Sequence, residues 1–239
     1  MSSPRVFLCA VVTGMALIGA GSAGAAEQPQ TTGRGTLRMP ADLPKVLLYS
    51  QLDAPGTLAT NSQNFETAND AFDNELADDF VVPAGGWMID TVSVVGVYFN
   101  GPGPAPTVRV TFYDNSGSLP GTAIAACNYP AIVPGGAGAS FTLTLAPPCA
   151  LAPGTYWVAV VANMNFTPGG QWGWTDRTVT SNSPAAWRNP GGGFGVAGCL
   201  AFGARGATCG IDAPAPDQLF SLSGVTTPVE LLDFSVEKR

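Results

Sequence analysis

Short apolar runs separated by Gly and Pro are the feature that most constrains the fold of this chain. From Phe80 onward, runs rich in β-branched and aromatic residues recur at fairly regular spacing, and the chain contains 30 Gly and 21 Pro. Within 107–114, Val108, Val110 and Phe112 alternate with Arg, Thr and Tyr, as on a strand with two different faces. Because helices of ordinary length are missing from the pattern, we expect an all-β fold. The predicted architecture is an antiparallel β-sandwich, jelly-roll-like, with long Gly/Pro-rich loops.

The first 26 residues read as a targeting segment and are set apart from the fold. Arg5 precedes an apolar run over 6–20, and Ala23 and Ala25 form an A-x-A pattern. This order of features is typical of a secretory signal peptide, and the run is shorter than the about 20 residues that a membrane span needs. We therefore expect residues 1–26 to be removed and the mature chain to have no membrane span.

The rest of the chain divides into three parts. Residues 27–44 are polar and lack periodicity, which predicts a flexible leader. Residues 45–225 carry the strand-like runs and form the predicted sandwich domain. Residues 226–239 are a C-terminal strand or a linker tail.

Four cysteines follow the signal peptide, and an even number in an exported chain indicates disulfides. Three pairings are possible, and the thiols could also stay reduced. We favour Cys127–Cys149 and Cys199–Cys209, because each pair flanks a short segment.

Charge and composition exclude several function classes. With 17 Asp and Glu against 10 Lys and Arg, the chain is acidic, which disfavours nucleic acid as a partner. There is no His at all, so catalytic triads and His-ligated zinc sites are excluded. The run GFGVAG over 193–198 lacks the strand–turn–helix context of a dinucleotide site, so we interpret it as a loop.

Several stretches resemble a group of uncharacterised secreted bacterial β-sandwich modules found in exported and cell-surface proteins. They are ADDFVVP, WMIDTVSVVGVYFN, VTFYDNSGSLPGT, PGTYWVAVVANMNF and GQWGWTDRT, which together span about residues 65–225. The tail TPVELLDFSVE is similar to segments that precede C-terminal sorting signals, but here no apolar helix follows it. The resemblance implies a jelly-roll-like sandwich and a location outside the bacterial cytoplasm, secreted, periplasmic or at the cell surface.

The segment GGQWGWTDRTVTSNSPAAW, 169–187, contains the candidate ligand-binding residues. In a strand Trp172 and Trp174 would point to the same side, and Gly173 would allow another backbone to approach closely. Two parallel indoles could stack on a sugar ring, but the simpler interpretation, which we favour, is that they fill the core of a Gly-rich fold. The candidate binding residues are Trp172, Trp174, Asp176, Arg177 and Trp187.

The carboxylates raise the further possibility of a metal site. Oxygen ligands before and at the start of a predicted strand could hold a structural Ca²⁺, although an ordinary acidic surface loop explains the same pattern. The candidate metal ligands are Asp70, Asp73, Asp78 and Asp79. We expect no other cofactor.

These observations favour a secreted, non-catalytic binding or surface module whose best-motivated ligand class is carbohydrate. A polysaccharide or a cell-surface component would be its partner. The alternatives are a structural or adhesive spacer that acts through protein contacts, and a glycan hydrolase that uses two carboxylates.

Overall fold

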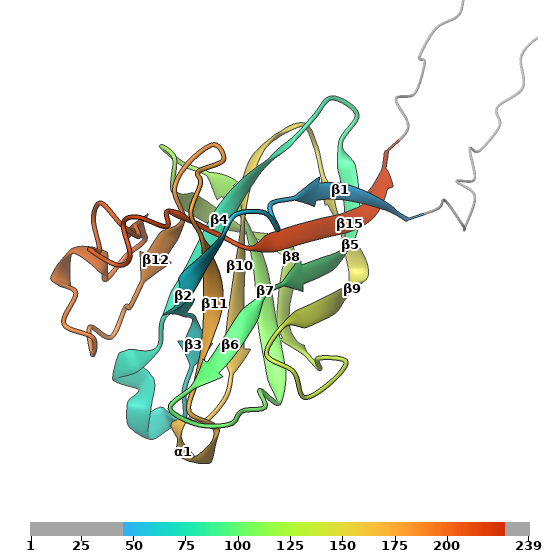
Figure 1. Cartoon of the computed structure of the whole chain (residues 1–239). Helices are drawn as coiled ribbons and strands as arrows, with labels where there is room; N and C mark the ends of the chain where they lie inside the picture. The colour runs from blue at the N-terminus through green and yellow to red at the C-terminus, as the bar shows by residue number, and fades with distance from the viewer. Residues whose placement is uncertain (1–44, 228–239) are drawn as a thin grey trace, which may run out of the picture. The chain divides into compact units, whose positions relative to one another are not determined.

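The computed structural model describes residues 45–227, and these form an all-β domain of three sheets packed in a sandwich-like arrangement (Figure 1). The predicted signal peptide and leader lie outside the described residues, as does the tail after Thr227. Jelly-roll topology is not what the strand order shows, because the strands divide among three sheets instead of two.

The largest sheet has seven strands in the order β13-β12-β4-β10-β7-β8, with β3 beside β10. All its pairings are antiparallel except that of β3 with β10. Its strands are β3 (Gln63–Asn64), β4 (Glu75–Val82), β7 (Thr107–Asn115), β8 (Pro120–Ile132), β10 (Gly154–Asn163), β12 (Ala186–Arg188) and β13 (Gly203–Ala204).

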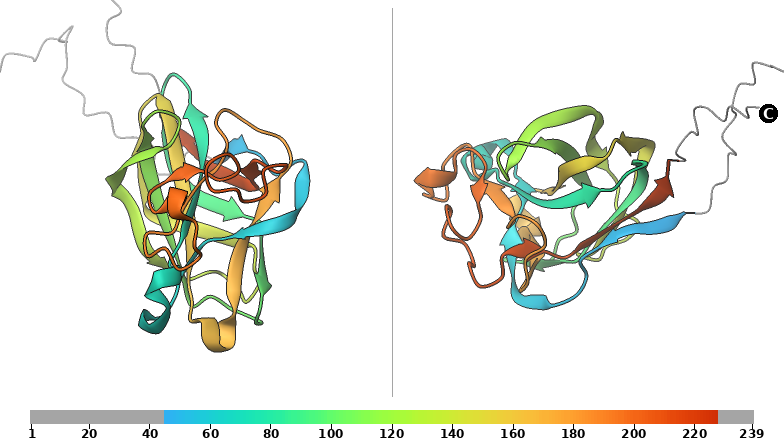
Figure 2. Two further views of the ribbon diagram at one scale, coloured as in Figure 1. Left: turned by 90° about the vertical axis from the view of Figure 1, so that its left-hand side faces the viewer. Right: turned by 90° about the horizontal axis from the view of Figure 1, so that it is seen from above.

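Two four-stranded sheets complete the domain, and Figure 2 shows them from two further sides. One has the order β1-β15-β5-β9, formed by β1 (Val46–Ser50), β5 (Trp87–Val94), β9 (Phe141–Leu151) and β15 (Phe220–Thr226). In the other, β11 (Gln171–Arg177) pairs with β2 (Pro55–Asn61), β6 (Gly96–Phe99) and β14 (Asp217–Gln218).

Helical structure is confined to short turns. The described residues contain η1 (Thr67–Phe72), α1 (Phe166–Gly169) and η2 (Ala197–Cys199). Within 45–227, no helix is long and apolar enough to cross a membrane.

The predicted alternation of β7 is confirmed. Val108, Val110 and Phe112 are fully buried in the main core, whereas Tyr113 joins a smaller cluster with Trp157 on the opposite face of the sheet. Strand β10 is buried on both faces, as its continuous apolar sequence predicts.

Both predicted disulfides are present. Cys127–Cys149 connects β8 to β9 and thereby joins the seven-stranded sheet to the β1-β15-β5-β9 sheet. Cys199–Cys209 closes a loop after β12. Two disulfides indicate an oxidising environment outside the cytoplasm.

Candidate functional site

The tryptophans of β11 lie in the interior of the domain. Trp172 and Trp174 are both fully buried, and their ring nitrogens each donate a 2.8 Å hydrogen bond to a main-chain oxygen. Between them, Gly173 does allow close approach, because a Cβ there would lie 3.0 Å from the Cβ of Ala59 on β2. Of the two interpretations of these indoles, core packing is thus the one observed: Trp172 and Trp174 present no face to solvent, and the exposed platform is corrected.

Asp176 and Arg177 pair with protein groups from other segments. Asp176 accepts a 2.7 Å hydrogen bond from Arg205, and both side chains are fully buried. Arg177 instead forms ion pairs with Asp53 and Asp217. Burial raises the pKa of Asp176 to about 6, although the Arg205 guanidinium opposes this shift. The predicted assignment of this pair to a sugar beside the tryptophans does not fit these contacts.

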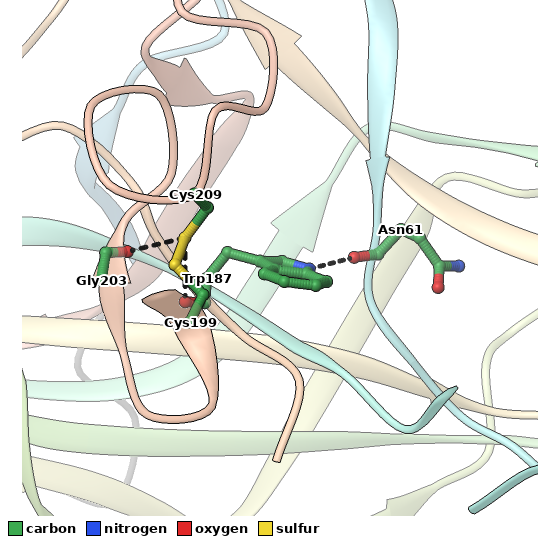
Figure 3. Close-up of a disulfide and its surroundings, with 5 residues drawn as sticks. All are labelled: Asn61, Trp187, Cys199, Gly203 and Cys209. Atoms are coloured by element: carbon green, nitrogen blue, oxygen red, sulfur yellow. Dashed lines mark hydrogen bonds between the residues drawn. A yellow bond between two sulfur atoms is a disulfide. The ribbon is translucent and has the colours of Figure 1, made fainter. Parts of the chain in front are cut away.

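Trp187 is also buried, beside the second disulfide. Figure 3 shows its ring nitrogen donating to the main-chain oxygen of Asn61, at 3.1 Å, with the Cys199–Cys209 bond next to it. The indole forms part of the wall of a cleft of about 420 Å³, which Asp176 and Phe194 also line. Of the predicted binding residues, Asp176 and Trp187 are thus brought to one cleft, and Trp172, Trp174 and Arg177 are not.

The four predicted metal ligands do not assemble. Asp70 is exposed on η1, whereas Asp78 and Asp79 are buried in β4 and have different partners. Asp78 accepts hydrogen bonds from Gln51 and Gln218, and Asp79 accepts one from the Ser183 amide. Among residues 45–227, no group of three or more His, Cys, Asp or Glu side chains is arranged to hold a metal ion.

A ridge at one end of the domain provides a better candidate. It consists of η1 and the glycine-rich loop 189–194, which contact each other closely. The amide of Gly193 donates to the Ala71 carbonyl at 2.7 Å, and a Cβ on Gly193 would lie 2.6 Å from that oxygen. Asn189 holds the same carbonyl through its side chain at 2.8 Å. Only glycine permits this approach, so the sequence GGG fixes the loop on η1.

The short helix η1 and the residue that follows it, Asp73, contribute side chains to two clefts. The turn is kinked at Asn69, whose φ of −117° and ψ of 15° are not helical. Asn69 and Phe72 line one cleft, and Asp70 and Asp73 line another. Ala71 lies between these pairs in sequence and meets the glycine loop. Figure 1 shows η1 and α1 at the same end of the described domain.

The first of these, the aromatic cleft, has a volume of about 270 Å³. Its most accessible side chains are Phe72, Phe166 and Phe194, which are 38%, 41% and 38% exposed. They come from η1, α1 and the glycine loop, and the rings of Phe72 and Phe194 meet edge to face at 5.3 Å. The remaining lining residues are Phe65, Asn69 and Gln171. The cleft thus combines open aromatic faces with two uncharged amides.

The second, the polar cleft, has a volume of about 260 Å³ and lies on the other side of η1. At its base, Glu75 accepts a 2.6 Å hydrogen bond from Arg188 and a 2.7 Å bond from the Tyr113 hydroxyl. Arg109 lies 3.6 Å from Oε2 of Glu75, the oxygen that Arg188 also contacts. Partial burial raises the pKa of the Asp73 carboxyl, which accepts a hydrogen bond from the Phe65 amide.

Sequence reasoning missed these phenylalanines and arginines, because they are far apart in the chain. The sequence NDAFD, 69–73, carries no regular period that would have marked them, since η1 is kinked at Asn69 and ends before Asp73. Of the predicted residues, Asp70 and Asp73 do lie at this ridge, but in a cleft that also contains two arginines.

Comparison with protein-family models, with curated proteins and with solved structures finds no match to this chain, so the arrangement of its own residues is the basis for a functional assignment.

Proposed function

We propose that this protein is an exported, non-catalytic glycan-binding module and that the aromatic cleft is its binding site. The observation that carries the proposal is the gathering of Phe72, Phe166 and Phe194 around one cleft, each more than a third exposed. Three segments far apart in sequence supply these rings. Partly exposed large apolar side chains clustered in this way indicate an interaction site.

The chemistry of the cleft fits a sugar. A sugar ring has apolar C–H faces, which pack on aromatic rings, and hydroxyls around its edge, which need hydrogen-bond partners. Asn69 and Gln171 supply amide groups beside the phenyl rings. The Asn69 side chain donates through its nitrogen to Glu66, and the Gln171 oxygen accepts from Asn100. Among the described residues, the Asn69 oxygen and the Gln171 nitrogen therefore remain for a ligand. A mainly apolar ligand would leave these amides without a role.

The disulfides support the proposed location. They indicate folding outside the cytoplasm, where extracellular polysaccharides and cell-surface glycans are present. Secretion through the signal peptide is part of the same proposal.

A structural spacer acting through protein contacts is the second candidate. It is favoured by β1, the edge strand of its sheet, where Val46 and Leu47 are 46% and 64% exposed. An exposed apolar edge strand can pair with a strand of another chain.

Affinity electrophoresis separates the candidates. The protein is run in native gels cast with soluble starch, xylan, mannan or mixed-linkage β-glucan, together with Phe166→Ala, Phe194→Ala and the control Leu52→Ala. Leu52 is 45% exposed on a different segment. At least one neutral polymer should retard the wild type and Leu52→Ala, and both Phe variants should lose most of the retardation. Circular dichroism melts confirm that the variants are folded.

Two results would contradict the proposal: retardation by none of the polymers, or retardation that both Phe variants retain in full. Release of reducing ends from the retarding polymer would contradict the non-catalytic part and favour a carboxylate-dependent hydrolase instead.

A further inference from the structure

We propose that the polar cleft is a second subsite that selects an uncharged glycan, by binding a pair of adjacent hydroxyls between Asp73 and Arg109. This inference rests on the proposed function and specifies its ligand class. It starts from the shared wall of the two clefts. Residues 69–73 contribute Asn69 and Phe72 to the aromatic cleft and Asp70 and Asp73 to the polar one, so a chain bound at the first site can extend to the second.

The base of the polar cleft is already neutralised internally. Glu75 is buried, and one of its oxygens accepts two hydrogen bonds from Arg188, at 2.6 and 3.1 Å. Its other oxygen accepts from Tyr113. The side chain of Arg188 also covers Phe202, with the guanidinium carbon 4.3 Å from the ring centroid. Glu75 and Arg188 therefore hold each other in place and have little capacity left for a ligand.

Arg109 and Asp73 differ from that pair in being only partly engaged. Arg109 reaches Glu75 at 3.6 Å, beyond hydrogen-bonding distance, and its side chain is 31% exposed. A guanidinium has five N–H groups, so several remain for a ligand. In Asp73, Oδ1 accepts from the Phe65 amide at 2.7 Å, and within residues 45–227 Oδ2 receives no hydrogen bond. The cleft thus offers free donors and a free acceptor.

A buried orphan atom lies at the same place. Asn74, only 3% exposed, lines the polar cleft, and its Oδ1 has no partner among the described residues. An unpaired buried acceptor is costly unless a donor reaches it, directly or through water. Because this oxygen is itself almost inaccessible, a ligand in the cleft would reach it through a bridging water.

The charge balance selects against acidic sugars. Asp70, Asp73 and Glu75 outnumber Arg109 and Arg188, so the cleft is negative overall, and the whole chain carries a formal charge of −7. A uronate carboxylate would meet Asp70 and Asp73 in a cleft where only Arg109 has free donors. A neutral sugar avoids this repulsion, because one hydroxyl can donate to Asp73 while its neighbour accepts from Arg109.

The test measures binding of two probe classes to matched variants. Asp73→Asn removes the charge but keeps an oxygen for the Phe65 amide, and Arg109→Gln leaves Glu75 with its hydrogen bonds from Arg188 and Tyr113. Asp90→Asn is the control, since Asp90 lies on β5, does not line the polar cleft and pairs with Lys45. Dissociation constants are measured by isothermal titration calorimetry for the neutral polymer that retards the wild type and for polygalacturonate.

The wild type should bind the neutral polymer at least on the order of tenfold more tightly than polygalacturonate. Asp73→Asn and Arg109→Gln should each weaken neutral binding on the order of tenfold, the loss expected for one charge-assisted hydrogen bond. Asp90→Asn should bind as the wild type does. Replacing both Asp70 and Asp73 with Asn should reduce the ratio between the dissociation constants for polygalacturonate and for the neutral polymer.

Unchanged neutral binding in both Asp73→Asn and Arg109→Gln would overturn this inference and leave the aromatic cleft as the binding site. Equal or tighter wild-type binding of polygalacturonate would also overturn it. Absence of binding to every polymer would instead defeat the proposed function itself, so the two failures can be told apart.

Discussion

The ring nitrogen of Trp174 donates a 2.8 Å hydrogen bond to the main-chain oxygen of Leu219, in a part of the domain that water does not reach. The ring of Phe220 meets the indole edge to face at 5.9 Å. Trp174 thus fills the space between β11 and β15 and also donates to a buried carbonyl, which it shares with the Val95 amide at 3.2 Å. Both contributions are structural.

We expect Trp174→Ala to lower the free energy of unfolding by about 3–5 kcal/mol, because it leaves a large cavity. Trp174→Phe should cost less, yet still about 1–3 kcal/mol, because it removes a buried hydrogen bond and part of the packed volume, although the Leu219 carbonyl keeps the Val95 amide as a donor at 3.2 Å. Urea unfolding followed by far-UV circular dichroism measures both. The surface control Leu52→Ala should fall within about 0.5 kcal/mol of the wild type, and an equally small effect of Trp174→Ala would show that the indole is not a core residue.

Breaking the buried ion pair between Asp176 and Arg205 should lower the free energy of unfolding markedly. Arg205→Met leaves the Asp176 carboxyl without its cation and should destabilise the domain by about 3–5 kcal/mol. Adding Asp176→Asn to this variant should restore part of the loss, because it removes the unpaired charge. Urea unfolding at pH 7.5 tests this, and strict additivity of the two single effects would contradict direct coupling.

Stability should depend on pH through Asp79. Burial raises the pKa of Asp79 from 3.8 to about 6 in the folded chain. A raised carboxyl pKa contributes stability below the unfolded value, and this contribution is lost as the pH rises through about 6.

Asp79→Asn should therefore raise the melting temperature relative to the wild type at pH 7.5 and give no such gain at pH 4. The variant keeps an oxygen for the Ser183 amide. Asp176, whose pKa is also raised to about 6, titrates in both proteins and cancels in the comparison. Asp217 does not cancel, because the charge of Asp79 helps to raise its pKa; removing that charge eases the ionisation of Asp217 and adds to the gain at pH 7.5. A gain that is the same at both pH values would contradict this assignment.

The glycine loop should be sensitive to a single methyl group. Gly193→Ala would place a Cβ 2.6 Å from the Ala71 oxygen and push the loop, with Phe194, away from η1. We expect a loss of about 1–3 kcal/mol of stability, as for overpacking elsewhere, together with weaker retardation by the neutral polymer. Gly135→Ala is the matched control, since nothing lies within 4 Å of its added Cβ. Equal behaviour of the two variants would show that the loop does not need to contact η1.

The parts of the fold set by local pattern could be predicted from the sequence. Alternation in 107–114 gave the two faces of β7, and short cysteine spacings gave both disulfides. Whether Trp172 and Trp174 are buried or exposed could not be predicted in this way. A two-residue period places them on one side of β11 but does not show what covers that side. Phe141 covers Trp172, with ring centroids 5.0 Å apart, and it lies about 30 residues earlier in the chain.

The candidate site could not be predicted either, because it is formed by residues that are far apart in the sequence. Phe72, Phe166 and Phe194 come together only because the loop 189–194 docks on η1 and α1 lies at the same end of the domain. Isolated phenylalanines in loops give no pattern that distinguishes a binding surface from a core. Their exposure, which makes them informative, depends on the tertiary structure.

The central claim is that glycan binds at the ridge between the two clefts, and amide chemical-shift mapping tests it most directly. A fragment of the retarding neutral polymer is titrated into the ¹⁵N-labelled mature protein. The account predicts that the largest shifts fall on residues 65–73, 166–171 and 189–194. Shifts confined to a distant segment, such as the loop 134–140 between β8 and β9, would contradict it.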